Sequence, residues 1–358
     1  ATLLSAGTEN HIPYWGALSI MGVMVIIYVT SSGIRGVTWT TVAQAVWMFV
    51  AVWAAAFWCL NLIEGDLMAL FNRVLEMDPE MLTLPGPQGL ATAQWWATWP
   101  VFGIALYWAI LPRGFMFFYS ARDVKTTKKI GLTVGFYLMA LYLPAMVIGF
   151  TAFTYFPELG GTGADSSFPR LLAEYAPAWF AGMIVAGGLA AGMSSLDADT
   201  NANSAMLTKD VYATFIKKDA EPTHYITVGR IFVVFLVAIT VLAASRNWGL
   251  VVLMIGVTAS MITQLLPAVI AVTVPMSRVW LTKAGVTSGI VAGLAVALAT
   301  RPAFYGGLLP EGIRFDPSFW GLVVNVPVAF IVSRFTAPPN ADDVARIRAA
   351  LDEEFRPT

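Results

Sequence analysis

Residues 193 to 212 carry a dense set of oxygen-bearing side chains directly after an almost wholly apolar run. The polar stretch is MSSLDADTNANSAMLTKDVY, and the run before it is MIVAGGLAAG. On a helix, five of the polar residues recur every three or four positions and share one face. These residues are Ser194, Asp197, Asn201, Ser204 and Thr208. Hydroxyl, carbonyl and carboxylate oxygens suit a hard cation, so the pattern points to binding of a monovalent cation such as Na⁺.

Two interpretations of this stretch stay open. In the first, Ser194 and Ser195 form a cation site together with the backbone carbonyl of Ala191, one turn earlier. In the second, the polar residues lie at a solvated helix end, which applies above all from Asp199 onward. Either interpretation can apply to Asp197. The run from 177 to 218 would span about 60 Å as a straight helix, so it must bend, tilt or leave the membrane.

The composition identifies an all-α integral membrane protein. Hydrophobic residues make up 58% of the 358 residues and charged residues 12%, far from the balance of soluble domains. Nine apolar stretches are long enough to cross a bilayer as helices. They cover residues 13–31, 38–62, 99–121, 128–155, 178–200, 225–246, 249–276, 284–300 and 317–336.

The distribution of basic residues predicts an orientation. Cytoplasmic loops of membrane proteins are enriched in Lys and Arg. With the N-terminus outside and the C-terminus inside, most of the 21 basic residues face the cytoplasm. These are Arg35, Arg122, Lys125, Lys128, Lys129, Lys209, Lys217, Lys218, Arg230, Arg278, Lys283, Arg334, Arg346, Arg348 and Arg356, against Arg73, Arg170, Arg246, Arg301 and Arg314 outside. We therefore expect residues 1–336 to form the transmembrane core and 337–358 a short cytoplasmic tail, helical and capped by Asn340 or Asp342.

Enzymatic and nucleic-acid-binding functions find no support in the sequence. The two histidines, His11 and His224, are far apart, and no nucleophile–base arrangement or phosphate-binding glycine loop is present. The basic residues follow membrane topology rather than forming a dedicated patch. The single cysteine, Cys59, excludes an intrachain disulfide.

Three motifs, in order along the chain, resemble the solute:sodium symporters. YVTSSGIRGVTWTTVAQ is similar to the turn into the family's fifth core helix, and YWAILPRGFMFFYSARDVKTTKK to its sixth core helix and the basic connection after it. AAGMSSLDADTNANSAMLTKDVY is similar to the eighth core helix and is the most specific of the three.

The resemblance implies the inverted-repeat fold of five plus five helices found in LeuT-like transporters, with ion and solute bound near the midplane. It implies Ala191 (carbonyl), Ser194 and Ser195 as Na⁺ ligands. It also implies that Tyr107, with Trp108 beside it, covers the solute from the inner side, although an ordinary aromatic pair is the alternative. No organic cofactor is expected.

The chain departs from the family pattern at two positions. The aspartate of the fifth-helix motif, which serves a second Na⁺ in some members, is Thr41 here. Asp197 offers a carboxylate one turn below Ser194 instead. The arginine of the sixth-helix motif is Phe117, and Arg113 lies nearby in LPRGF, where Pro112 and Gly114 weaken the helix. Arg113 is either a partner for an anionic solute or a side chain that snorkels to the interface.

Two further groups are candidates for contact with solute. Gln264 lies at membrane depth and either touches solute or hydrogen-bonds a neighbouring helix. Trp95, Trp96 and Trp99 form either a solute vestibule or an interfacial aromatic belt.

Aligned in this way, the chain begins at the fourth core helix, so the first core helix and its share of the site are expected in an N-terminal segment or a second chain. The predicted function is sodium-coupled symport of a small organic solute by alternating access, in the cytoplasmic (inner) membrane of a bacterium. The alternative is a transporter-derived subunit or sensor that binds without transporting.

Overall fold

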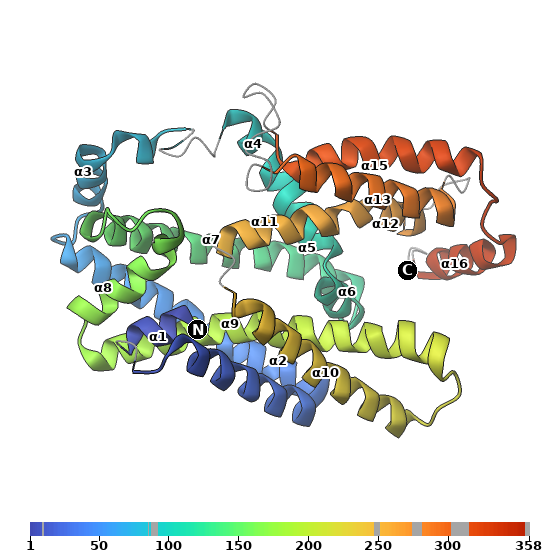
Figure 1. Cartoon of the computed structure of the whole chain (residues 1–358), viewed down its shortest axis with the longest axis horizontal. Coiled ribbons are helices and arrows are strands. Elements are labelled where there is room, and N and C mark those ends of the chain that lie inside the picture. The colour runs from blue at the N-terminus through green and yellow to red at the C-terminus, as the bar shows by residue number, and fades with distance from the viewer. Residues whose placement is uncertain are drawn as a thin grey trace. The chain divides into compact units, whose positions relative to one another are not determined.

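The computed structural model describes residues 1–8, 11–84, 86, 92–246, 251–273, 281–301 and 315–354, and all regular elements in them are helices (Figure 1). The chain divides into two compact units. The first comprises residues 1–82 and 116–251, and the second residues 83–115 and 252–358. Arg278, Arg314 and Arg356 of the orientation prediction, like both ends of the predicted 249–276 segment, lie outside the described residues.

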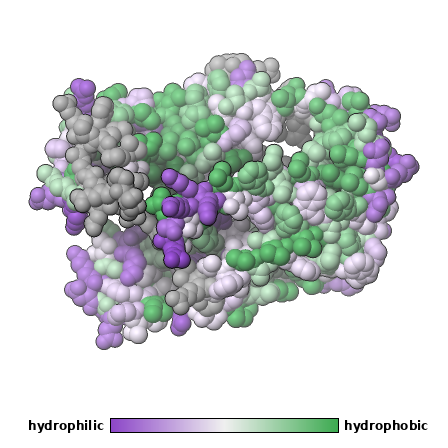
Figure 2. Space-filling view, turned by 180° about the vertical axis from the view of Figure 1, so that it is seen from behind, coloured by the Kyte–Doolittle hydropathy of each residue, from purple (hydrophilic) through white to green (hydrophobic). Residues whose placement is uncertain are grey.

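The predicted membrane segments are helical, with one correction: the stretches 13–31 and 38–62, predicted as separate spans, are joined in a single helix, α2 (Tyr14–Leu62). Seven helical stretches in the described residues are long and apolar enough to span a membrane, and a bent pair makes an eighth. Residues 283–299 form a shorter apolar helix. Large apolar side chains such as Trp39 and Phe136 are 77% and 74% exposed, and hydrophobic groups cover much of the face in Figure 2. A surface of this kind is expected to contact lipid.

The first unit is built around three long membrane helices: α2 (Tyr14–Leu62), α7 (Val124–Tyr155) and α9 (Ala178–Met206). A π-helix, η4 (Leu207–Ile216), continues α9, and α10 (Pro222–Ala244) returns along it. Shorter helices complete the unit: α1 (Thr2–Gly7), α3 (Leu67–Met77), η1 (Pro79–Leu82), η3 (Gly161–Ser166) and α8 (Ser167–Tyr175). Its larger apolar core joins α2, α7, α8 and α9, with Ile63, Leu171 and Leu172 fully buried.

The second unit begins with α4 (Ala93–Thr98), the π-helix η2 (Trp99–Ala105) and α5 (Leu106–Ile110). It continues with five helices and a 3-10 turn. These are α11 (Val251–Ile262), η5 (Thr263–Leu265), α12 (Leu266–Thr273), α13 (Lys283–Ala299), α15 (Pro317–Arg334) and α16 (Ala341–Glu354). α16 is the predicted tail helix, and the Asn340 side chain accepts a hydrogen bond from the Asp342 amide at 3.0 Å, which confirms Asn340 as its cap.

The predicted weakness at Pro112 and Gly114 is also confirmed. α5 ends at Ile110, and Leu111 after it has φ −58° and ψ 133°, because the residue before a proline is driven out of the helical region. α6 (Pro112–Tyr119) restarts at the proline, and the two helical pieces meet at 57°. A Cβ at Gly114 would lie 3.1 Å from the Trp108 carbonyl oxygen, so glycine permits the tight approach at this break.

Three glycines on one face of α13 let it pack directly against α15. A Cβ at Gly289 would come within 2.5 Å of Asn325 Oδ1 and 2.8 Å of both Ala329 Cβ and the Asn325 carbonyl. Gly285 and Gly293, one turn away on either side, are equally confined. Small residues at this spacing let helix backbones approach closely, and van der Waals packing then holds the pair together in lipid.

Gly289→Leu is expected to destabilise the second unit by about 1–3 kcal/mol or more, the usual cost of overpacking, because the obstructing atoms include backbone. The control is Gly135→Leu in α7, where a Cβ would meet nothing within 4 Å. Melting temperature in detergent measures both. Equal loss in the two variants would contradict glycine-mediated packing.

Candidate functional site

The predicted cation ligands adjoin one another on α9. The Ser194 hydroxyl donates a hydrogen bond to the Ala191 carbonyl oxygen at 2.9 Å, as the three-residue spacing on a helix allows. Ala191 and Ser194 are half-buried and Ser195 is exposed. Two oxygens that share one cation must be neighbours, and these two already are.

The small residues preceding the site bring α2 against α9. A Cβ at Gly187 would lie 2.3 Å from the Ala51 Cβ, so only glycine fits there. Small residues on a helix face admit a neighbouring backbone in this way.

Asp197 lies inside the first unit. Its exposure is 0%, and the Tyr28 hydroxyl interacts electrostatically with its carboxylate, with Gln44 next to the same hydroxyl. Tyr28 also donates to the Met193 carbonyl at 3.4 Å. Tyr28 and Gln44 were not assigned from the sequence, although both lie in the fifth-helix motif. The Thr41 hydroxyl donates within its own helix to Val37 at 2.7 Å.

The lower part of the polar stretch divides between solvent and interior. Asn203, Lys209 and Asp210 are exposed, as the solvated interpretation predicts. Three other polar residues are nevertheless buried, contrary to that interpretation: Thr200, Ser204 and Thr208. Ser204 and Thr208 satisfy their hydroxyls on backbone carbonyls of the preceding turn, so burial leaves no donor unpaired.

The predicted gate residues belong to the second unit. Tyr107 and Trp108 meet edge to face at 5.8 Å between ring centroids, and Trp108 is 43% exposed. The Arg113 guanidinium lies 4.7 Å from the centre of the Trp108 ring, a cation–π distance. Arg113 therefore reaches back across the helix break onto the aromatic pair.

Gln264 is part of a buried network that joins η5 to α11 and α15. Its side-chain amide donates to the carbonyls of Ser260 at 3.1 Å and Ser318 at 3.3 Å, and the Asn325 amide donates to its backbone and side-chain oxygens at 2.7 and 3.2 Å. The hydrogen bond to a neighbouring helix, one of the two alternatives, is thus present. Asn325 could not be paired with it from sequence, because 61 residues separate them.

Gln264→Met is expected to lower stability by about 1–3 kcal/mol, because Met fills a similar volume and leaves buried polar groups unpaired. Maximal solute uptake should fall while the half-saturating solute concentration stays within about twofold. Melting temperature and uptake kinetics check this. A changed half-saturating concentration at unchanged stability would instead place Gln264 at the solute.

A second polar cluster adjoins this network. The Arg301 guanidinium donates to the Ser260 hydroxyl at 3.0 Å, and Asp316 caps α15 through the Ser318 amide at 2.8 Å. Burial raises the pKa of Asp316 above its ordinary value, while hydrogen bonds from Ser318 and the charge of Arg301 oppose the shift. Burial lowers the pKa of Arg301, and the Asp316 charge opposes that. Burial thus disfavours the charged forms of both side chains, and the opposite charge of each partner offsets part of that desolvation cost for the other.

The three tryptophans predicted at the start of the sixth core helix form one cluster. Trp95 and Trp99 stack at 4.7 Å between ring centroids, and Trp96 meets both edge to face. Such a cluster fits the vestibule and the aromatic belt equally.

Within the described part of the chain, no group of three or more His, Cys, Asp or Glu side chains could hold a metal ion. The sites found consist of hydroxyls, carbonyls, amides and single carboxylates instead. The α9 residues belong to the first unit, and Tyr107, Trp108, Arg113 and Gln264 to the second.

Long apolar helices, one of them broken, define a helical membrane protein, and discontinuous membrane helices are a feature of secondary transporters. Residues 8–293 match the sodium:solute symporter family. The chain belongs to that family, and it is therefore a sodium-coupled secondary transporter rather than an enzyme.

The chain is also similar to one curated protein and to one solved structure. The chain is 27% identical over 340 residues to the "Uncharacterized symporter YhjB" of Bacillus subtilis (strain 168), covering 93% of this chain and 68% of the relative. It also resembles the solved structure "Substrate-bound outward-open state of a Na+-coupled sialic acid symporter reveals a novel Na+-site", with a TM-score of 0.68 at 21% identity over 94% of this chain and 70% of that chain. The structural likeness shows a shared fold.

Proposed function

We propose that this chain imports a small organic solute together with Na⁺, with Ala191, Ser194 and Ser195 supplying Na⁺ ligands. The observation that carries the assignment is the 2.9 Å contact between the Ser194 hydroxyl and the Ala191 carbonyl, in the helix that resembles the family's ion-binding helix. Asp197 contributes negative charge one turn below, and Tyr107 with Trp108 covers the solute from the inner side.

The chain's own α9 supplies only part of a cation's coordination shell. Hard cations take about six or more oxygen ligands when they leave water, and α9 offers two oxygens in contact, those of Ala191 and Ser194, with Ser195 as the next residue. We propose that residues of a preceding segment or of a second chain complete the shell.

A Na⁺ gradient is expected to drive uptake of one solute from a panel of amino acids, sugars and monocarboxylates into proteoliposomes. A K⁺ gradient of the same size should not drive this uptake. Solute-stimulated ²²Na⁺ entry in the same vesicles tests coupling directly. If Na⁺ stabilises the protein but no solute moves, the chain is a binding subunit or sensor rather than a symporter.

We further propose the cytoplasmic membrane, with the N-terminus of the chain outside and the C-terminus inside. A cysteine placed at Lys218, in a Cys59→Ser background that removes the only native thiol, is expected to react with a membrane-impermeant maleimide only after cells are opened. Labelling in intact cells would show that the chain has the opposite orientation.

A further inference from the structure

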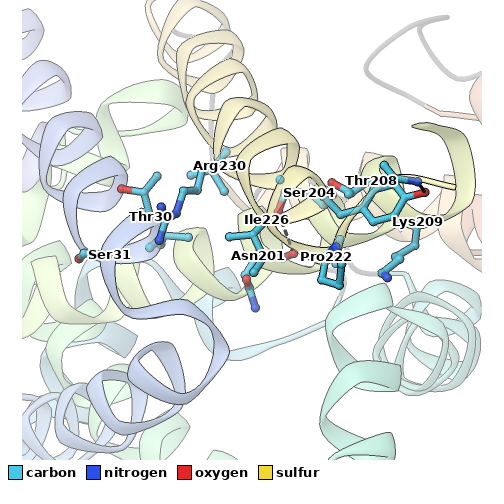
Figure 3. A pocket seen from close by; sticks show the side chains of 15 residues that line it. Thr30, Ser31, Asn201, Ser204, Thr208, Lys209, Pro222, Ile226 and Arg230 are labelled. Atoms are coloured by element: carbon cyan, nitrogen blue, oxygen red, sulfur yellow. Dashed lines mark hydrogen bonds between the residues drawn. The ribbon is translucent and has the colours of Figure 1, made fainter. Parts of the chain in front are cut away.

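A groove in the first unit has no part in the proposed transport site. It encloses about 700 Å³ between one end of α9 with η4, the beginning of α10 and the Val29–Ser31 segment of α2 (Figure 3). Its polar side chains include Asn201, Lys209 and Arg230, and its apolar ones include Val29, Ile226 and Val233.

The charge of the groove is entirely positive. Lys209 and Arg230 line it, and no carboxylate does. Neither cation forms an ion pair within the part of the chain that the structure describes. α10 begins at Pro222 on the same wall, so the positive end of its helix dipole adds to the two side chains. A ligand of this groove is therefore an anion.

Hydrogen-bond donors in the groove point to the same ligand. The Ser204 and Thr208 hydroxyls already donate to carbonyls within their own helix. The donors left for a ligand are the Lys209 ammonium, the Arg230 guanidinium and the Asn201 side-chain amide, which makes no hydrogen bond with the described residues. In Figure 3, Arg230 lies toward one end of the labelled row and Lys209 toward the other, with Asn201 between them. These donors are spread along the groove, so a ligand that meets all three carries several acceptor oxygens.

Tyr225 fixes one wall of the groove. Its hydroxyl lies 2.8 and 2.7 Å from the carbonyl oxygens of Lys217 and Lys218, to which it can donate, and accepts from the Ala220 amide at 3.3 Å. The Lys209 ammonium lies 5.2 Å from the centre of the same ring. One side chain thus fixes the turn between η4 and α10 and positions a cation on its face.

The apolar surface beside the cations indicates an amphiphile. Val29 and Val233 are buried in the unit, whereas Ile226 is 56% exposed on α10. Ile231, Val234 and Phe235 continue that exposed apolar surface along the membrane helix. A free anion would use only the polar part, while a phospholipid would place its headgroup at Lys209 and Arg230 and its acyl chains along α10.

We propose that this groove binds the phosphate headgroup of an anionic phospholipid. In the proposed orientation it faces the cytoplasmic leaflet, where anionic lipids act on basic membrane-protein surfaces. The proposal does not depend on which ion or solute the transporter carries.

The test is native mass spectrometry of the purified full chain from micelles containing equal amounts of phosphatidylglycerol and phosphatidylcholine. The wild type is expected to retain phosphatidylglycerol selectively. Lys209→Gln/Arg230→Gln should reduce that preference by roughly 25-fold, because each basic residue contributes about fivefold. The control, Lys217→Gln/Lys218→Gln, removes the same charge from the adjacent turn without touching the groove, and should retain the preference.

All four basic side chains are exposed, so the variants are expected to fold, and unchanged melting temperatures verify it. Equal loss of phosphatidylglycerol in both double variants would overturn the site in favour of general surface charge. Inorganic phosphate at constant ionic strength is the second arm. If phosphate displaces the retained lipid or stabilises the protein as much as phosphatidylglycerol does, the groove takes a free anion and the lipid assignment fails. The lipid assignment is also overturned if the wild type shows no preference for phosphatidylglycerol over phosphatidylcholine. That result is expected if a polypeptide segment, rather than a lipid, covers the groove.

Discussion

Ser194→Ala is expected to shift Na⁺-driven solute uptake to much higher Na⁺ concentrations while the protein keeps its fold. Ser194 is half-buried, and among the residues that the structure describes its hydroxyl bonds only to the Ala191 carbonyl one turn earlier. Removing the Ser194 hydroxyl costs little packing, and alanine has a higher helix propensity than serine. The proposed cation, however, loses one of its close oxygen ligands. A hydrogen-bond-like contact to a charged group is worth about 1.5–3 kcal/mol, which corresponds to a roughly 10- to 100-fold loss of Na⁺ affinity.

Two measurements separate this effect from a folding defect. The first is uptake in proteoliposomes as a function of external Na⁺. The second is the difference in melting temperature between NaCl and KCl, which follows Na⁺ binding without knowledge of the solute. Thr154→Ala is the matched control, because the Thr154 hydroxyl donates to the Thr151 carbonyl at 2.8 Å in α7, outside the proposed site. A Na⁺-dependent stabilisation that survives Ser194→Ala unchanged would remove Ser194 from the site.

The fold was predictable where the signal is local. Each predicted apolar stretch is helical in the described residues, because hydrophobic length alone decides whether a segment can span a bilayer. Hydrophobic length did not show that the stretches 13–31 and 38–62 are joined in one helix. The break before Pro112 followed from proline geometry, and the cap at Asn340 from side-chain chemistry within two residues. The polarity of α9 could not be divided correctly from sequence. Thr200, Ser204 and Thr208 lie on a face that neighbouring helices cover, and the identity of those neighbours depends on the tertiary structure.

The polar networks escaped prediction for the same reason. Gln264 was recognisable as a polar residue at membrane depth, but its partner Asn325 lies 61 residues later. Arg301 and Ser260 are 41 residues apart, and each looks ordinary in its own segment. Tyr28 was part of a quoted motif, yet nothing in its local sequence indicates that it meets Asp197 on another helix. Such pairs are fixed by packing, and spacing rules within one helix cannot find them.

Asp197→Asn is expected to lower the apparent Na⁺ affinity by about tenfold or more. The carboxylate is fully buried one turn from Ser194. At roughly 6 Å and an effective dielectric constant of about 20, a unit charge stabilises a cation by roughly 3 kcal/mol. Asparagine keeps the volume and can still hydrogen-bond the Tyr28 hydroxyl, so stability should change less than ion binding does.

Two comparisons make the result specific to charge at this position. Asp210→Asn removes a carboxylate from an exposed position on η4, about 24 Å along the helix from Ser194, and should leave Na⁺ affinity unchanged. Tyr28→Phe removes the hydroxyl beside Asp197 but leaves the charge of the Asp197 carboxylate in place. This variant should therefore have a lower melting temperature and a nearly unchanged Na⁺ affinity. If Asp197→Asn instead behaves like Tyr28→Phe, losing stability at constant Na⁺ affinity, the carboxylate serves the contact between α2 and α9. The cation site then consists of neutral oxygens alone.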